Sequence, residues 1–114
     1  MSSEQSTRQG PFAHLRAAAG PPAERIGDLI DALYADETLD TKTRELIYIG
    51  VQTALRLHGS IRIHVPRAIK AGATRMEVLA AMMTAVPNAG MNGPIECWPI
   101  AAEIFDEYAS DQAR

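Results

Sequence analysis

The residues most able to do chemistry gather in one stretch, HGSIRIHVPRAIKAGAT, which covers positions 58–74. His64 can exchange protons near neutral pH, and Arg62 or Arg67 can hold a carboxylate through a forked pair of hydrogen bonds. On a continuous helix, Ser60, His64 and Arg67 follow steps of four and three residues, so they share one face. Arg62 does not share it. These residue types can hold an anion and move a proton, or they can form only a polar patch on a helix.

Pro66 complicates the helix that carries these side chains, because a proline inside a helix removes the hydrogen bond to the Arg62 carbonyl. One solution begins the regular helix near Val65 and places Pro66 in its first turn, where the missing N–H costs little. His64 would then lie at a helix N-terminus. The helix dipole disfavours an imidazolium at that end, which would bias His64 towards a neutral base.

The elements that position these residues follow a helical period, and no alternating strand pattern of useful length interrupts it. Asp40 or Thr41 can cap one helix. Gly72 can end the helix that contains His64 in a left-handed conformation. Thr74 and Glu77 match a Thr-x-x-Glu capping box at the start of the next helix. We therefore expect an all-α fold of about five to six helices.

Each expected helix carries an apolar face, and the second is apolar on more than one side, so it should be the most enclosed. The residues expected to point inward are, helix by helix, Ile26, Leu29, Ile30, Leu33 and Tyr34; Leu46, Ile47, Ile49, Val51, Ala54 and Leu55; Met76, Leu79, Met82, Met83 and Val86; and Trp98, Ala102, Phe105 and Tyr108. A chain of 114 residues can hardly cover this much apolar area alone. A homo-oligomer is favoured over the alternative of a compact monomeric bundle.

The composition of the chain indicates its domain organisation, its possible partners and its compartment. We expect a flexible N-terminal arm over residues 1–22 and one helical domain over 23–114, because Gly20-Pro21-Pro22 closes a polar segment. The net charge of −3 and the scattered basic residues argue against nucleic acid as a partner. No apolar run suits a membrane span or a signal peptide. The single cysteine fits a reducing compartment, so we expect a cytoplasmic protein.

The run LDTKTRELIYIGVQTALRLHGSIRIHVPRAIKAGATRMEVL, residues 39–79, resembles the core of the carboxymuconolactone decarboxylase and alkylhydroperoxidase D-like superfamily. Its most specific pieces are Thr43-Arg44-Glu45 and His64 followed eight residues later by Gly72-Ala73-Thr74. The resemblance continues through Asn88-Ala89-Gly90 to AAEIFDEY, residues 101–108. It implies an all-helical protomer that assembles as a trimer or a hexamer, with active sites in clefts at or near subunit contacts.

The peroxidase branch of this superfamily has a Glu, a Cys-x-x-Cys pair and a His four residues after the second Cys. Glu45 and His64 fall on the first and last of these positions, but Leu57 and Ser60 occupy the cysteine positions. Peroxide reduction needs a thiolate to attack the O–O bond and a second thiol to resolve the sulfenic acid. The resemblance therefore disfavours peroxidase activity.

The decarboxylase branch also lacks the two cysteines and keeps the histidine, and Arg62-Ile63-His64 matches the end of its motif. Ser60 stands where that branch has an acid. The resemblance implies that His64 donates or accepts a proton and that Glu45 sets its charge and tautomer. The substrate would be a small cyclic or unsaturated carboxylic acid, with no cofactor and no metal. A non-catalytic oligomer that only binds a small molecule, or acts as a scaffold, is the alternative.

The decarboxylases line their pocket with the region that follows the VPNAGMNGP break, so the resemblance makes wall candidates of Asn88, Asn92, Glu96 and Trp98. Glu96 is also a candidate replacement for the acid missing at Ser60. Structural roles remain open at several of these positions. His58 can satisfy carbonyls at a helix C-terminus, Trp98 can anchor a core or an interface, and Cys97 can be buried and inert.

Overall fold

The computed structural model describes residues 12–112, and every regular element within that range is a helix. The elements are α1 (Ala13–Ala19), α2 (Pro21–Ala35), α3 (Thr41–Ala54), α4 (His58–Lys70), α5 (Arg75–Met83), α6 (Val86–Ala89) and α7 (Asn92–Gln112). The all-α prediction is confirmed. The chain forms two compact units, which divide between Leu39 and Asp40 rather than at residue 22. Residues 13–19, which we expected in a flexible arm, form α1; residues 1–11 of that arm lie outside the described range.

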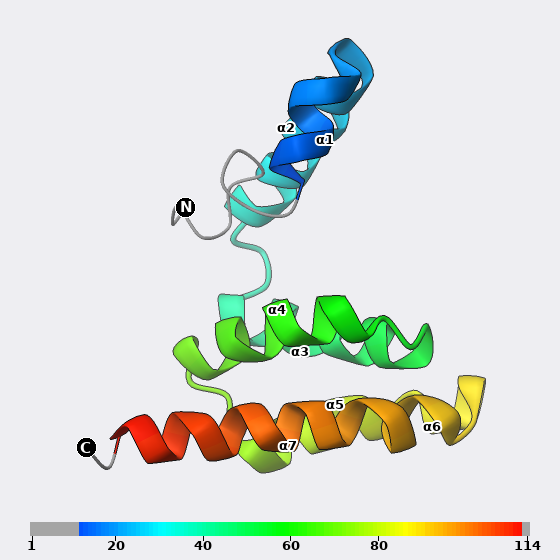
Figure 1. The fold of residues 1–114 in the computed structure, drawn as a ribbon, viewed down its shortest axis with the longest axis vertical. Coiled ribbons are helices and arrows are strands. Elements are labelled where there is room, and N and C mark those ends of the chain that lie inside the picture. The colour runs from blue at the N-terminus through cyan, green and yellow to red at the C-terminus, as the bar shows by residue number, and fades with distance from the viewer. Residues whose placement is uncertain (1–11, 113–114) are drawn as a thin grey trace. The chain divides into compact units, whose positions relative to one another are not determined.

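In the first unit, α1 and α2 lie side by side (Figure 1) and are joined by one arginine. The Arg16 side chain is only 4% exposed, and its guanidinium lies 3.0 Å from Glu24 Oε2, 3.0 Å from Asp28 Oδ1 and 3.4 Å from Asp31 Oδ2. The hydrogen bond to Glu24 is the main cause of the raised pKa of Arg16. The helix pair is therefore held by charge-assisted hydrogen bonds.

We expected the large apolar residues of α2 to point inward, and for most of them this prediction is wrong. Ile26, Leu29 and Leu33 are more than half exposed, whereas Ala23 and Gly27 are buried. The buried positions are the small ones, which let two helices approach closely. The large side chains consequently lie on the other side of α2.

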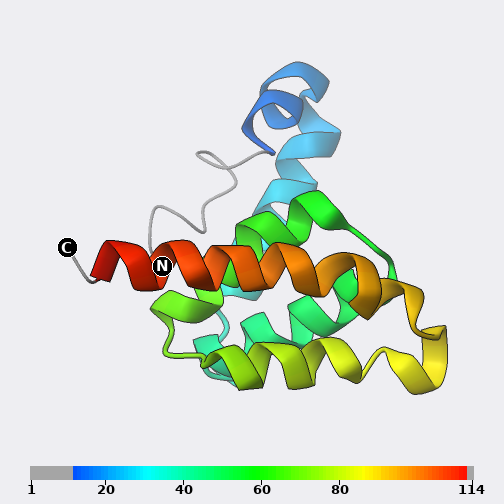
Figure 2. The ribbon, with the colours of Figure 1, turned by 60° about the horizontal axis from the view of Figure 1, so that its bottom comes forward.

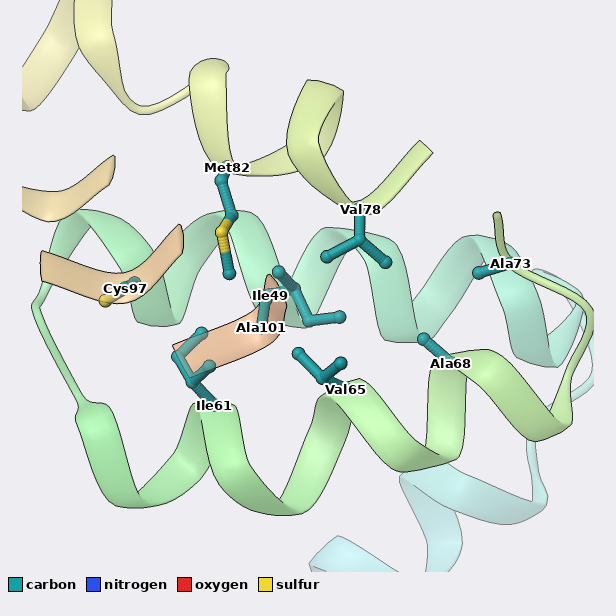
Figure 3. Close-up of a cluster of buried hydrophobic side chains, with 9 residues drawn as sticks. All are labelled: Ile49, Ile61, Val65, Ala68, Ala73, Val78, Met82, Cys97 and Ala101. Carbon is teal, nitrogen blue, oxygen red and sulfur yellow. The ribbon is translucent and has the colours of Figure 1, made fainter. Parts of the chain in front are cut away.

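The second unit is built around four helices, α3, α4, α5 and α7, each of which contacts two or more of the others (Figures 1 and 2). The core lies between them (Figure 3). Val78 and Met82 of α5 point towards Ile49 of α3, and Ile61 and Val65 approach from α4. These side chains are fully buried, so this core fixes the relative positions of α3 and α4.

The helix ends follow the expected local signals. The Asp40 side chain accepts a hydrogen bond from the Thr43 N–H at 2.7 Å, which lowers the pKa of that carboxyl group. Thr74 and Glu77 form a reciprocal capping box at the start of α5. Gly72 has a φ of +96° after the end of α4, a conformation that an L side chain rarely adopts. The predicted caps and the left-handed stop are confirmed.

Helix α3 packs against α4, α5 and α7 and has a larger share of buried residues than any other described helix, so the expectation that it is the most enclosed is confirmed. Ile49 and Thr53 are buried, but Ile47, Val51 and Leu55 are about half exposed. Ile47, Val51 and Leu55, which we expected to point inward, follow steps of four residues and form one exposed strip, which the neighbouring helices leave uncovered. The prediction that Met76 and Met83 of α5 and Tyr108 of α7 point inward is also wrong. These side chains are exposed, because no other helix covers them.

Helix α4 runs without interruption from His58, so the expected start near Val65 is wrong. Pro66 lies inside it. The Arg62 carbonyl, which loses its helical partner at Pro66, belongs to an exposed residue and can be hydrated. His64 consequently lies in the middle of a helix, and the bias that we derived from a helix N-terminus does not apply to it. No helix within residues 12–112 is long and apolar enough to cross a membrane.

Replacing Gly93 with alanine should destabilise the second unit. A Cβ at Gly93 would overlap the carbonyl oxygen of Thr53 and would lie 3.0 Å from the carbonyl carbon, so α3 and α7 would have to separate. Overpacking of this kind costs about 1–3 kcal/mol. Thermal or urea unfolding of the variant measures the loss.

Gly59→Ala is the matched control, because nothing lies within 4 Å of a Cβ at Gly59. Alanine in place of glycine inside a helix is favourable by roughly 0.5–1 kcal/mol, so this variant should be at least as stable as the natural protein. Equal stability of Gly93→Ala and the natural protein would show that the close approach of α3 and α7 is wrong.

Candidate active site

Glu45 and His64 meet across the contact between α3 and α4. Glu45 Oε2 lies 2.8 Å from His64 Nδ1, and the Glu45 side chain is completely buried while that of His64 is 14% exposed. Burying a carboxylate is costly unless hydrogen bonds compensate. A proton on Nδ1 gives the carboxylate such a bond and directs the other ring nitrogen, Nε2, away from Glu45. The two residues predicted as catalytic are therefore brought together.

The burial of Glu45 excludes the simplest structural account of it. A carboxylate that only favoured a helix N-terminus would be in the first turn and exposed. Glu45 is the fifth residue of α3, and its Oε1 is a buried atom with no hydrogen-bond partner within residues 12–112. Among the described residues, its polar contact is with His64 Nδ1. The geometry therefore places Glu45 as the residue that orients this imidazole.

Tyr48 is a part of the site that sequence reasoning missed. Its ring meets the His64 ring edge-on, with centroids 5.5 Å apart and planes at 84°. Tyr48 lies three residues after Glu45, so both project from the same side of α3 towards α4. That spacing was the available signal, but tyrosine at such a position is as common in cores as in sites. Tyr48 and Glu45 together fix the plane of the His64 ring.

The two arginines near His64 in the sequence lie on different sides of α4. Arg67 is part-buried and lies three residues after His64, and Ser60 lies one turn before it, so these residues share a face as predicted. Arg62 is exposed and lies two residues from His64, which places it on a different side of the helix. The continuous helix thus favours Arg67 over Arg62 as a neighbour of His64.

His58 and Glu96 belong to a second polar cluster. Glu96 Oε1 lies 2.9 Å from His58 Nε2, and Glu96 Oε2 lies 3.3 Å from Arg56. His58 is the first residue of α4, so the alternative that it satisfies the carbonyls of a helix C-terminus is wrong. Among the described residues, Glu96 makes its side-chain hydrogen bonds with Arg56 and His58 and not with His64. It therefore does not replace the acid that the resemblance places at Ser60.

The other residues that we predicted to line the pocket are Trp98, Asn88 and Asn92, and the structure does not bring them to His64. Trp98 packs against the core and carries the Arg75 guanidinium 5.4 Å from its ring centroid, a cation–π contact. Asn88 and Asn92 are exposed, in α6 and at the start of α7. No contact joins these three residues to Glu45 or His64 in the described part of the chain. Trp98 thus has the core role that we left open.

Cys97 is fully buried in the core of the second unit (Figure 3). Burial raises the pKa of this thiol, and the nearby Glu96 carboxylate raises it further. A buried thiol with a raised pKa is neither accessible nor nucleophilic. Its position fits the structural role that we left open for it.

One open apolar groove, with a volume of about 560 Å³, lies between α3 and α5. Leu46, Gly50, Val51 and Ala81 are among its lining residues, and neither Glu45 nor His64 is. The groove is thus apart from the polar pair. Within residues 12–112, no group of three or more His, Cys, Asp or Glu side chains is arranged to hold a metal ion.

One comparison with known proteins assigns the chain to a family. No curated protein and no solved structure matches the chain significantly. A family model, described as "Carboxymuconolactone decarboxylase family", matches residues 21–103. This match spans most of the chain and includes Glu45, Tyr48, Ser60 and His64. The chain belongs to the carboxymuconolactone decarboxylase family.

Proposed function

We propose that this protein is an enzyme that moves a proton on a small cyclic or unsaturated carboxylic acid or lactone, with or without loss of carbon dioxide. The observation that carries the proposal is the contact between the fully buried Glu45 carboxylate and His64 Nδ1 at 2.8 Å. An imidazole held in this way presents Nε2 as its working atom. Family membership supports a small carboxylic acid as the substrate class.

His64 is the proton-transfer group in this proposal, and Glu45 is its positioning residue. The buried carboxylate lies against Nδ1 and turns Nε2 away from itself, so His64 carries a proton to the reacting carbon from Nε2. Tyr48 keeps the ring in place through its edge-on contact. Arg67, on the same face of α4 as His64, pairs with the substrate carboxylate through a forked hydrogen bond.

The decarboxylation of a lactone acid balances with these groups alone. The bond between the ring carbon and the carboxylate breaks, and its electron pair enters the conjugated ring towards the lactone carbonyl. Carbon dioxide leaves. His64 then donates the Nε2 proton to a ring carbon and becomes neutral, while Glu45 continues to accept from Nδ1. Solvent restores the proton, so the cycle needs no oxidant or cofactor.

A comparison of two arginine variants tests this proposal. Arg67→Gln should raise KM for unsaturated lactone acids roughly tenfold or more, because a hydrogen bond to a charged group is worth about 1.5–3 kcal/mol. Arg62→Gln removes the same charge from a different side of α4 and should leave KM unchanged. Steady-state kinetics with a panel of lactone acids measures both. No turnover of any panel member by the natural protein would refute the proposal.

We also propose that the protein works as a homo-oligomer of three or six chains. The exposed apolar side chains of the described residues support this, among them Ile26, Leu29, Leu33, Val51 and Leu55. Burying such surface between copies is favourable at about 25 cal/mol per Å². Light scattering at micromolar concentration should give three or six times the chain mass. A monomer mass would contradict the proposal.

A further inference from the structure

The described part of the first unit has almost no apolar core of its own. Among residues 12–39, the buried ones are Arg16, Ala23 and Gly27, and the hydrophobic core cluster consists of residues of the second unit. Short helices that pack no apolar face are only marginally stable in water. The first unit therefore needs a surface to pack against.

Helix α2 carries an apolar face that could meet such a surface. The face, which we call the α2 stripe, consists of Ile26, Leu29, Ile30 and Leu33. Steps of three, four and seven residues place these side chains on one side of the helix, the spacing with which a helix anchors itself in a groove. Three of the four are more than half exposed. Residues 2–11 contain no large apolar side chain, so they do not supply the missing cover.

The groove between α3 and α5 is open, apolar and floored by small residues. Gly50 and Ala81 are among its lining residues, so the backbone of another helix can approach closely. Two polar side chains of the lining are already engaged, because the Thr84 hydroxyl donates to the Ala81 carbonyl and Glu77 pairs with Lys42. A groove of this kind suits an apolar protein surface better than a small polar ligand.

The groove matches the α2 stripe in length. Its lining on α3 runs from Thr43 to Val51, which is roughly 12 Å at the helical rise per residue. The α2 stripe runs from Ile26 to Leu33, which is roughly 10 Å on the same basis. One helix face of this length fills the groove from end to end.

The charges at the two ends set the direction of the fit. Helices α3 and α5 both begin at the end where Lys42 pairs with Glu77, so the positive ends of two helix dipoles lie there. The exposed Asp36 and Glu37 follow the C-terminal end of α2, and the exposed Arg25 lies near its N-terminal end. When α2 runs antiparallel to α3, the carboxylates meet the positive ends and the arginine meets the negative ends. Opposite charges then face each other at both ends.

We infer that the α2 stripe of one copy lies in the groove between α3 and α5 of the next copy, antiparallel to α3. A stripe meets a groove and not another stripe, so the contact is heterologous, and each chain gives one stripe and receives one. A closed ring satisfies every stripe and every groove, which three chains can form. The inference rests on the proposed homo-oligomer and is independent of the proposed catalysis.

Charged substitutions on the two surfaces test the contact. Leu29→Lys, at the centre of the stripe, and Val51→Lys, in the groove, should each lower the mass from light scattering to that of one chain. Both side chains are more than half exposed, so circular dichroism should show unchanged helix content. Leu15→Lys is the matched control, because Leu15 is equally exposed but lies on α1, and its oligomer should persist. An oligomer that survives Leu29→Lys and Val51→Lys overturns the inference and leaves the proposed homo-oligomer standing. A natural protein that is a monomer overturns both.

A disulfide between introduced cysteines shows which copy supplies the stripe. The antiparallel fit brings Ile26 to Val51, so the double variant Ile26→Cys with Val51→Cys should give covalent dimers and trimers on a non-reducing gel after mild oxidation. Leu33→Cys with Val51→Cys, at opposite ends of the fit, should stay unlinked. The natural Cys97 is buried and does not interfere. A link within one chain, no link, or equal linking in the control pair overturns the inference.

Discussion

Replacing His64 with glutamine should lower the turnover of an unsaturated lactone acid by roughly two to four orders of magnitude, the usual contribution of a positioned acid or base. Glutamine can still form a hydrogen bond with Glu45 but cannot carry a proton to carbon. His64→Ala should be about as inactive, because it removes the same atom. Steady-state kinetics on both variants, with melting temperatures measured alongside, gives the result.

The relative effects of the two His64 variants distinguish catalysis from structure. If His64 served only to satisfy the buried Glu45 carboxylate, glutamine would preserve activity and stability while alanine would lower both. Our account expects the glutamine variant to fold and assemble normally and yet to lack activity. Activity within a few-fold of the natural protein in both variants would remove His64 from the mechanism.

Glu45→Gln should reduce turnover roughly ten- to a hundredfold, since a hydrogen bond to a charged group contributes about 1.5–3 kcal/mol. The amide fills the same buried space but puts a neutral acceptor in place of the charged one that lies 2.8 Å from His64 Nδ1. It can also offer an N–H to Nδ1, which permits the wrong tautomer. The loss should appear mainly in kcat, because Glu45 does not hold the substrate carboxylate.

Glu103→Gln is the matched control for this variant. Glu103 is an exposed carboxylate on α7 with no hydrogen bond or ion pair to Glu45 or His64 within residues 12–112, so the Glu103→Gln variant should be as active as the natural protein. A Glu45→Gln enzyme with unchanged kcat would show that the buried carboxylate does not tune His64. A loss confined to KM would show instead that Glu45 contacts the substrate directly.

Local signals in the sequence were sufficient to predict much of the fold. The Asp40 cap, the Thr74–Glu77 capping box and the positive φ of Gly72 depend on residues within four positions of one another. Their physics is complete without tertiary contacts, so a single sequence reveals them. The contact of Glu45 with His64 joins residues 19 positions apart; the family resemblance, not periodicity, pointed to it.

Other features depend on partners that periodicity cannot identify. The exposed Leu29 and the buried Gly27 lie on different sides of α2, and apolar spacing does not reveal which side the fold covers. Pro66 appeared to demand a helix start. A helix interior tolerates it here because the carbonyl that it leaves unpaired belongs to the exposed Arg62. The pairing of His58 with Glu96 similarly required the docking of α7 on α4.

The most direct test of the central claim, that His64 held by Glu45 delivers a proton to carbon, is turnover of an unsaturated lactone acid in D₂O with the product examined by NMR. A positioned acid adds one deuterium per molecule, at one carbon and from one face of the ring. We expect a single deuterated stereoisomer from the natural protein, formed roughly two to four orders of magnitude more slowly by His64→Gln. A product deuterated on both faces, or the same stereoisomer formed at the same rate by His64→Gln, would contradict the account.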